Sequence, residues 1–225
     1  MFPLKDTIRS RTFPVVNTAI IAINVLVFIY EFGLGRHLDA FINEYGLTPV
    51  RFYWGLKNNL ADAIIPIFTS MFLHGGWLHV LGNMWFLYIF GDNVEDRVGH
   101  VGYVFFYLLC GVGAALSQTL LFPTSSVPMV GASGAIAGVL GAYFLLFPHS
   151  RVLTIVPIFF FLQLMEIPAV VFLIFWFVLQ FLQGSMAGAG HGGGVAWWAH
   201  IGGFLIGMAL IFVFKKREER EFYWQ

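Results

Sequence analysis

Charged residues are scarce in this chain of 225 residues, where Asp, Glu, Lys and Arg together make up 11%. A soluble domain carries about 25%, so this chain lacks the charge to cover a water-facing surface, and 59% of its residues are hydrophobic. The formal net charge is zero, which excludes the basic surplus typical of nucleic-acid-binding proteins. The single cysteine, Cys110, excludes an internal disulfide framework. These scarcities predict an integral membrane protein whose surroundings are the lipid bilayer, with no nucleic-acid partner.

Six apolar runs predict six membrane-spanning helices, because about 20 apolar residues cross a bilayer. Their expected ranges are 13–32, 77–91, 101–121, 133–148, 167–182 and 195–214. The expected fold is therefore an all-α membrane protein, a bundle of six transmembrane helices over residues 13–214. A polar segment, 1–12, precedes this domain, and a charged tail, 215–225, follows it. The first run is long and lacks a small-residue cleavage site, which favours a retained helix over a signal peptide.

Three connecting stretches depart from this pattern. Residues 33–76 are too polar to span and too long for a turn, and their aromatic residues predict a long first loop at the membrane interface. Residues 152–182 are too long for one span and too short for two, so their first half is expected to lie at the interface as well. Residues 184–194 are rich in glycine, which predicts a flexible loop.

The basic residues predict the orientation. In a six-span arrangement most of them fall on one side of the membrane: Lys5, Arg9, Arg11, Arg97, Arg151, Lys215, Lys216 and Arg217. Cytoplasmic segments carry the excess of Lys and Arg, so both termini are expected in the cytoplasm. The chain is little more than the six-span core, which favours a prokaryotic plasma membrane, with an organellar membrane as the alternative. Ser133 and His200 then lie near the outer ends of their helices.

The stretch Gly131-Ala132-Ser133-Gly134 opens the fourth apolar run. A helix over 133–148 rises only about 24 Å, less than the ~30 Å hydrocarbon thickness, so the serine end is expected below the membrane surface. A hydroxyl at that depth costs free energy unless it has a partner. The partner predicted here is His200, in the sixth run.

Small residues recur along both runs at helical spacing. Gly134 and Gly138 share a face of the fourth helix, and Gly203 and Gly207 share a face of the sixth with His200. Small residues let membrane helices pack closely. If the two faces meet, Ser133 and His200 come within reach, which is the arrangement of a nucleophile and its base.

His79 and Asn83 lie one turn apart on the second span, at the depth predicted for Ser133. An amide, an imidazole N–H and a helix N-terminal backbone N–H are donors that hold a developing oxyanion. Each residue also has a structural interpretation, as a helix cap or as a polar contact between helices. Their common depth favours the chemical interpretation. His74 and His191 are expected at the interface, outside this site.

Three stretches resemble, in order, the motifs of rhomboid intramembrane serine proteases: HxxxN at 79–83, GxSG at 131–134 and AHxxG at 199–203. The resemblance covers about residues 13–214. It implies a dyad of Ser133 as nucleophile and His200 as base and then acid, with His79, Asn83 and the Ser133 N–H as oxyanion donors. It also implies substrates that are single membrane-spanning helices cut near their outer end, and no metal ion, nucleotide or other cofactor.

Two positions depart from the family pattern. Many members carry a Trp-Arg pair in the first loop, where this chain has Ile65 and Pro66. Some place a tyrosine four residues after the serine, against the histidine, where this chain has Ala137. The sequence therefore leaves open how the loop is braced and what orients the His200 ring.

Other functions remain as alternatives at this stage. An inactive relative that binds and escorts membrane helices would typically lack the serine or the histidine, and both are present. A transporter or channel would carry ionisable residues deep in several spans, whereas only Glu31 and Glu166 come near, both expected at interfaces. The sequence contains no His-Glu-x-x-His zinc motif and no pair of aspartates in two spans. The fifth span, rich in phenylalanine and without a glycine face, is the expected entry gate for a substrate helix.

Overall fold

The computed structural model describes residues 1–187 and 196–216. Most of the predicted glycine-rich loop 184–194, with His191, and most of the charged tail 215–225 fall outside these residues. Within them, four helices are long and apolar enough to cross a membrane: α1 (Val15–Gly33), α6 (His100–Leu121), α8 (Ala169–Ala187) and α9 (Trp197–Phe214). Two shorter or bent helices occupy the remaining predicted positions, α5 (Trp77–Val98) and α7 (Ser133–Leu146).

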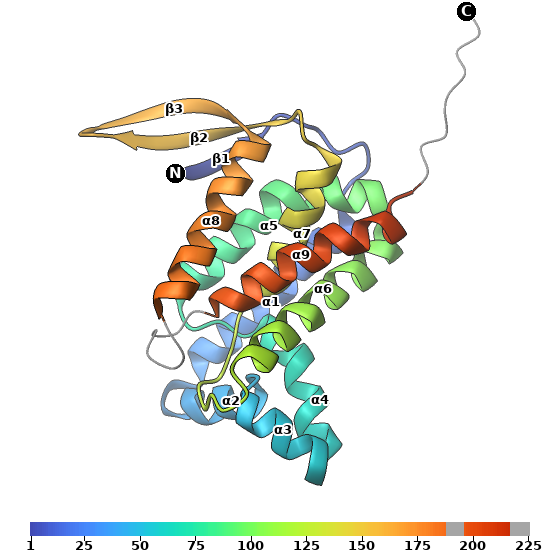
Figure 1. The fold of residues 1–225 in the computed structure, drawn as a ribbon, viewed down its shortest axis with the longest axis vertical. Helices are drawn as coiled ribbons and strands as arrows, with labels where there is room; N and C mark the ends of the chain where they lie inside the picture. The colour runs from blue at the N-terminus through green and yellow to red at the C-terminus, as the bar shows by residue number, and fades with distance from the viewer. Residues whose placement is uncertain (188–195, 217–225) are drawn as a thin grey trace, which may run out of the picture.

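The helices α5 and α7 differ from the four long apolar helices. α5 forms a bent pair with the preceding α4 (Leu60–Thr69), with an angle of 80° at the break. α7 has 14 residues and rises about 21 Å. It packs against α5, α6, α8 and α9, and Figure 1 shows it in the middle of the bundle. Every residue from Ala135 to Tyr143 is buried, so α7 is enclosed by protein.

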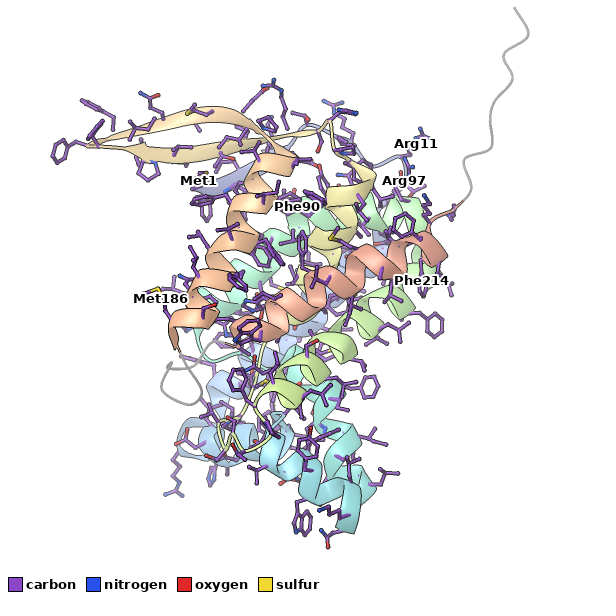
Figure 2. All side chains as sticks on the ribbon, in the orientation of Figure 1. Met1, Arg11, Phe90, Arg97, Met186 and Phe214 are labelled. Carbon is purple, nitrogen blue, oxygen red and sulfur yellow. The ribbon has the colours of Figure 1, made fainter. Side chains whose placement is uncertain are left out.

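Glycines bring α7 and α9 into backbone contact. A Cβ atom built on Gly207 would meet the carbonyl oxygen of Gly138, and one built on Gly203 would meet the carbonyl oxygen of Gly134. The two glycine faces therefore meet each other, as small residues allow in membrane bundles. Larger aromatic residues fill the rest of the core, among them Phe90, which Figure 2 shows among the helices.

The long first loop folds into short helices at one end of the bundle (Figure 1). They are η1 (Gly35–His37), α2 (Leu38–Tyr45), α3 (Pro49–Asn58), α4 and η2 (Ser70–Phe72). Several large apolar side chains on them stay exposed, including Trp54 at 54% and Leu60 at 58%. Exposed rings and aliphatic side chains suit the predicted interfacial position.

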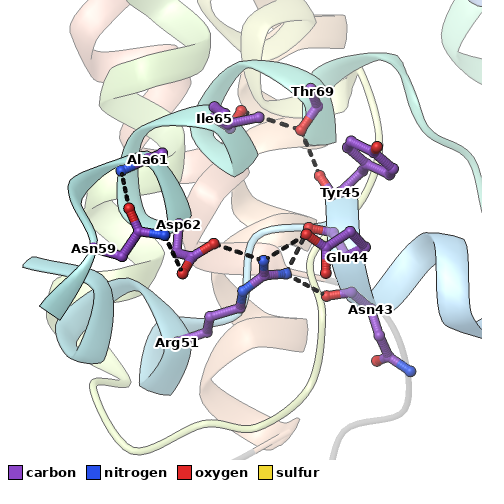
Figure 3. A network of polar contacts seen from close by, with 9 residues as sticks. All are labelled: Asn43, Glu44, Tyr45, Arg51, Asn59, Ala61, Asp62, Ile65 and Thr69. Carbon is purple, nitrogen blue, oxygen red and sulfur yellow. Dashed lines mark hydrogen bonds and ion pairs between the residues drawn. The ribbon is translucent and has the colours of Figure 1, made fainter.

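Arg51 braces this loop (Figure 3). Its guanidinium donates to the backbone carbonyls of Asn43 and Glu44 at 2.9 and 2.6 Å, and to the carboxylates of Glu44 and Asp62 at 2.9 and 3.1 Å. These bonds join α2, α3 and α4. Thr69 adds a bond from its hydroxyl to the Tyr45 carbonyl at 2.6 Å. The role left open by the missing Trp-Arg pair is thus taken by an arginine from another part of the loop.

A three-stranded antiparallel sheet covers the opposite end of the bundle, and we call this the sheet end (Figure 1). Its order is β1 (Phe2–Asp6), β2 (Arg151–Ile158) and β3 (Phe161–Pro168). The sequence did not predict this sheet: the first half of 152–182 is a β-hairpin, and the N-terminal segment is its edge strand. Residues 152–165 are apolar on both faces, so they lack the polar-apolar alternation that identifies a strand.

Acidic residues at the end of α5 hold the start of α1. The Glu95 carboxylate, fully buried, accepts from the backbone N–H groups of Val16 and Asn17 at 2.9 and 2.7 Å. Asp96 accepts from the N–H groups of Arg11 and Thr12 at 3.2 and 3.1 Å. A carboxylate at a helix N-terminus satisfies donors that have no partner within the helix. This arrangement fixes α1 against α5.

Candidate active site

Ser133 is the first residue of α7, and the loop before it is held in place on two sides. The Gly131 N–H donates to the Ser70 carbonyl at 2.9 Å. Met129 and Leu47 exchange backbone bonds of 3.1 and 2.8 Å. Gly131 has φ +127°, a conformation that only glycine adopts easily. The backbone conformation therefore explains why a glycine stands at position 131. The bonds on both sides of the loop hold Ser133 at a fixed position.

His200 reaches this serine from α9. Its Nε2 atom lies 2.7 Å from the Ser133 Oγ atom. The His200 side chain is buried, and the two residues are 67 positions apart in sequence. The backbone contact between the glycine faces of α7 and α9 sets this distance, because it brings the two helix ends together.

Gln180 of α8 orients the His200 ring. Its Oε1 atom lies 2.7 Å from His200 Nδ1, and its side chain is buried. An amide oxygen only accepts hydrogen bonds, so the Nδ1 atom carries the proton. Nε2 then offers its lone pair to the Ser133 hydroxyl. The bond to Gln180 thus selects the tautomer in which the histidine can accept the serine proton.

Two tryptophans flank the same ring. Trp176, one turn before Gln180 on α8, lies 6.1 Å from the His200 ring centroid, and Trp197 of α9 lies 6.0 Å away, edge to face. Sequence reasoning missed Gln180 and Trp176. A signal existed, because Gln180 is the one amide or charged residue in the apolar stretch 169–182. These α8 side chains fill the role that the family's tyrosine would have at Ala137.

His79 presents a donor to the same place as Ser133. The Gly75 N–H donates to His79 Nδ1 at 3.4 Å, which leaves the ring proton on Nε2. A Cβ atom built on Gly131 would lie 2.7 Å from His79 Nε2 and 3.4 Å from Ser133 Oγ. The imidazole N–H and the hydroxyl therefore border one small volume beside Gly131.

Asn83 lies one turn further along α5 and is buried. Its Nδ2 group has no hydrogen-bond partner among the described residues. A buried donor without a partner is costly and calls for an explanation. The unpaired donor is explained if Asn83 binds a negative charge that forms only during a reaction, such as an oxyanion.

His74, which the sequence analysis expected outside this site, lies against His79 and is bonded to Glu31. His74 and Glu31 are each 1% exposed. The His74 backbone N–H donates to both Glu31 carboxylate oxygens, at 3.3 and 3.1 Å, and the His74 ring packs edge to face on His79 at 5.2 Å. The sequence did not reveal this position, because it depends on the break between η2 and α5, which places His74 against both α1 and α5. Glu31 thus holds the His74 backbone, and the His74 ring packs against the His79 ring.

A small cavity of about 40 Å³ lies beside Ser133. Small side chains make up most of its wall, together with Ser70, Met71, Met129 and Val130: Gly111, Ala114, Ala115, Gly131, Gly134, Ala135, Ala196 and Ala199. A space of this size admits a few waters or one short side chain. The cavity can therefore take a small group next to the serine hydroxyl.

These observations define a class of protein, a helical membrane protein with a hydrogen-bonded serine and histidine at the end of a buried helix. A serine whose hydroxyl is bonded to an oriented imidazole, beside several N–H donors, is equipped for nucleophilic acyl transfer. Comparison with known proteins gives the family. A family model described as the Rhomboid domain matches residues 61–217, and this chain belongs to the rhomboid family.

Several curated relatives are similar to this chain. Rhomboid-like protein 11, chloroplastic, of Arabidopsis thaliana is 37% identical over 116 residues, covering 51% of this chain and 39% of the relative. RHOMBOID-like protein 1 of the same plant is 33% identical over 153 residues, covering 68% and 35%. The putative rhomboid protease YdcA of Bacillus subtilis is 29% identical over 133 residues, covering 59% and 62%. The matched stretch thus spans well under half of the two plant relatives.

Proposed function

We propose that this protein is an intramembrane serine endopeptidase that cleaves single-pass transmembrane helices near their outer end, with Ser133 as nucleophile and His200 as base. The observation that carries the proposal is the pair of 2.7 Å bonds on the two nitrogens of His200, one to Ser133 and one to Gln180. Membership of the rhomboid family and the putative protease YdcA among the relatives support it.

In the first half-reaction the Ser133 Oγ atom attacks the carbonyl carbon of the scissile bond. His200 Nε2 accepts the serine proton while Nδ1 keeps its own proton on Gln180. Negative charge grows on the carbonyl oxygen, and the volume beside Gly131 receives it. There His79 Nε2, Asn83 Nδ2 and the Ser133 backbone N–H donate to that oxygen.

When this tetrahedral intermediate collapses, His200 Nε2 gives its proton to the leaving amine and the C–N bond breaks, which completes the first half-reaction and leaves an acyl ester on Ser133. In the second half-reaction water attacks the ester carbon and His200 Nε2 accepts a proton from that water. The ester C–O bond then breaks, the proton returns to Ser133 Oγ, and the carboxylic acid product leaves. The small cavity beside Ser133 provides space for that water or for the side chain next to the cut bond.

Substrate entry is proposed along α8. Phe172, near the start of α8, stacks on Phe90 of α5 with ring centroids 6.2 Å apart. Further along, α8 reaches α9 through aromatic contacts such as Phe177 with Phe204 at 5.0 Å. Many α8 side chains face outward, including Val171 and Val178 at 53% and 45% exposure. Side-chain contacts of this kind separate more easily than the backbone contacts between α7 and α9.

The proposed orientation places the sheet end and both termini in the cytoplasm. It rests on the positive-inside rule, because Lys5, Arg9, Arg11 and Arg151 all belong to segments at the sheet end. The site then opens toward the outer leaflet, where the first-loop helices lie.

The test is cleavage of a generic membrane-helix substrate by purified protein in liposomes, together with labelling by a fluorophosphonate probe. Wild type is compared with Ser133→Ala and His200→Ala, each checked for folding by its unfolding temperature. The proposal expects cleavage and labelling by wild type and loss of both in the two variants.

Two results would contradict it. If the Ser133→Ala variant still cleaves the substrate, Ser133 is not the nucleophile. Folded wild type that neither cleaves nor takes the label supports the alternative, a rhomboid-like protein that binds and escorts membrane helices without cutting them. That alternative also predicts that helix binding is equal in wild type and Ser133→Ala.

A further inference from the structure

The β2–β3 hairpin extends sideways from the sheet end, away from the bundle (Figure 1). Its base is held by the protein: Val152 and Thr154 are fully buried, and β1 pairs with β2 up to Ile155. Beyond that register both strands continue to a two-residue turn at Phe159 and Phe160. Each strand has eight residues. At ~3.3 Å per residue, the free part reaches on the order of 10 Å beyond the base.

Apart from Gln163, the exposed side chains of the turn and of the neighbouring part of β3 are apolar. They are Phe159 at 94%, Phe160 at 98%, Phe161 at 72%, Leu162 at 75%, Leu164 at 65% and Met165 at 43%. Figure 2 shows the side chains of this region clear of the other described elements. Residues 152–165 contain no formal charge. In water, such a strand pair would be marginally stable and prone to aggregation.

The apolar surface is continuous with the surface that the bundle turns toward lipid. β3 ends at Pro168 and α8 begins at Ala169, with no residue between them. The next outward residues on α8, Val171 and Ile174, are 53% and 49% exposed. Apart from Glu166, the exposed surface that runs from the side of this membrane-spanning helix onto the hairpin is therefore apolar. The simplest molecule to cover the hairpin surface is the same lipid that surrounds the outward side of α8.

Basic residues outnumber the exposed acidic residue at the base, which fits lipid as the molecule that covers the hairpin. Arg151 begins β2 and Lys5 lies on β1, and both are exposed, as is Glu166 of β3. Basic residues beside an inserted apolar segment attract anionic lipid headgroups, at about 1 kcal/mol each near the surface. The base is thus suited to headgroups and the tip to acyl chains.

The unpaired edge of β3 sets the depth. In the order β1-β2-β3, one edge of β3 has no strand partner among the described residues. Backbone groups without partners cannot enter the hydrocarbon core, where each costs several kcal/mol. Gln163, exposed on β3, adds a polar side chain. The hairpin must therefore stay at the boundary, where headgroups and water satisfy the edge while the turn phenylalanines reach the first acyl carbons.

From these observations we infer that the β2–β3 hairpin is a lateral membrane anchor, which lies in the headgroup–acyl boundary of the leaflet at the sheet end and inserts Phe159, Phe160 and Phe161 into lipid. This inference is independent of the proposed protease activity. Because the hairpin leads directly into α8, it also ties the depth of that helix to the lipid surface.

The experiment places an environment-sensitive nitrobenzoxadiazole dye on single cysteines. Cys110, the only native cysteine, is first replaced by alanine. The dye is then attached at Phe160→Cys or Leu162→Cys, with Arg11→Cys as the matched control, exposed at the same end of the protein. The protein is reconstituted in vesicles of phosphatidylcholine and phosphatidylglycerol, and quenching is measured with nitroxide-labelled lipid and with aqueous iodide.

A membrane anchor predicts blue-shifted emission at Phe160→Cys and Leu162→Cys, with quenching by a nitroxide placed near the headgroup and little by iodide. Arg11→Cys should show the reverse. Iodide quenching at Phe160→Cys without lipid quenching would overturn the inference. Dye-to-dye energy transfer that rises with the protein-to-lipid ratio, with neither quencher effective, would instead show that a second copy of the chain covers the hairpin, and would also overturn it. Unfolding temperatures equal to that of the parent protein verify that each variant is folded.

Discussion

His200 Nδ1 and Gln180 Oε1 lie 2.7 Å apart, so the histidine of α9 is held by a side chain of α8. Trp176, one turn earlier on α8, packs near the same ring. Serine and histidine come from α7 and α9, whereas the group that fixes the histidine tautomer comes from the helix along which we propose substrate entry. The reactivity of Ser133 should therefore depend on the position of α8 relative to α9, because that position determines whether Gln180 can bond to His200.

Replacing Gln180 with leucine tests this dependence. Leucine has no acceptor, so His200 can turn or carry its proton on Nε2, where it no longer accepts the serine proton. We expect fluorophosphonate labelling of Ser133 to slow by about 10-fold or more, since oriented acid–base groups contribute 10²–10⁴-fold. Labelling needs no substrate helix, and a fall in kcat with little change in KM should accompany it.

Two variants provide the controls. Gln180→Glu keeps an oxygen acceptor for Nδ1 and should retain most of the labelling rate. Gln183→Leu changes an exposed amide on the same helix and should label like wild type. Equal labelling by Gln180→Leu and wild type would show that the bond does not position His200.

Gly207→Ala tests the contact between α7 and α9. Its methyl group would meet the backbone of Gly138, which cannot move aside as a side chain would. We expect a loss of about 1–3 kcal/mol in the free energy of unfolding, the usual cost of overpacking, and slower labelling of Ser133. Thermal unfolding in detergent measures the first effect. Gly82→Ala is the matched control, because a Cβ atom there meets nothing within 4 Å, and the unfolding temperature should not fall.

Arg51→Met tests the brace of the first loop. The substitution removes bonds to two carbonyls and two carboxylates that join α2, α3 and α4. The Arg51 and Asp62 side chains are 24% and 25% exposed, so solvent weakens these interactions, and we expect a cost of about 1–2 kcal/mol. Faster proteolysis within residues 33–76 is the measurement. Lys57→Met, an exposed change on the same helix, should leave the cleavage rate unaltered.

Asp6 should make stability depend on pH. Burial, with a smaller contribution from the charge of Asp92, raises the pKa of the Asp6 carboxyl from 3.8 to about 6. The folded protein therefore binds this proton more tightly than the unfolded chain. The stabilisation is complete below pH 3.8 and is lost as pH rises through about 6.

The measurement is the unfolding temperature across this range for wild type and Asp6→Asn. Wild type should lose stability relative to the variant as pH rises, because asparagine stays neutral. Its amide oxygen can still accept from Asn93 Nδ2 or the Tyr143 hydroxyl, which bond to Asp6 at 2.8 and 2.6 Å. A constant difference between the two proteins at all pH values would contradict the assignment.

The cavity beside Ser133 predicts which bonds are cut. Its walls are mostly glycine and alanine, and its volume is about 40 Å³. A substrate with alanine before the cut bond should be cleaved faster than one with phenylalanine there, by about 10-fold or more, since misfit of a large group costs about 1–3 kcal/mol. Mass spectrometry of the products from a pair of substrates gives the ratio. Equal rates would show that the cavity does not receive that side chain.

The positions of the helices and of the central residues could be predicted from the sequence, because long apolar runs and glycine spacing are local signals. His200 follows from the helix face it shares with Gly203 and Gly207, and Ser133 from its place between two glycines at the start of a short apolar run. The sheet could not be predicted in this way. Residues 152–165 have no polar face to reveal a period of two, so their length alone gave an interfacial segment without its secondary structure.

Gln180, His74 and Arg51 illustrate a second limit. The sequence contains each of them, but their roles depend on how one element is rotated or folded against another. Gln180 is informative only once α8 turns it toward α9, and His74 only once the break before α5 turns inward. Arg51 replaces the expected bracing pair from a position 14 residues earlier than Ile65, which no alignment of motifs would indicate.

The glycine contact between α7 and α9 also determines what can vary when the bundle moves. Gly138 and Gly207 touch through backbone atoms, so we expect these two helices to move together. The Ser133–His200 distance should then stay constant when the proposed gate opens, while the contacts of α8 change. Movement of α8 would break and restore the bond from Gln180 that sets the tautomer of His200.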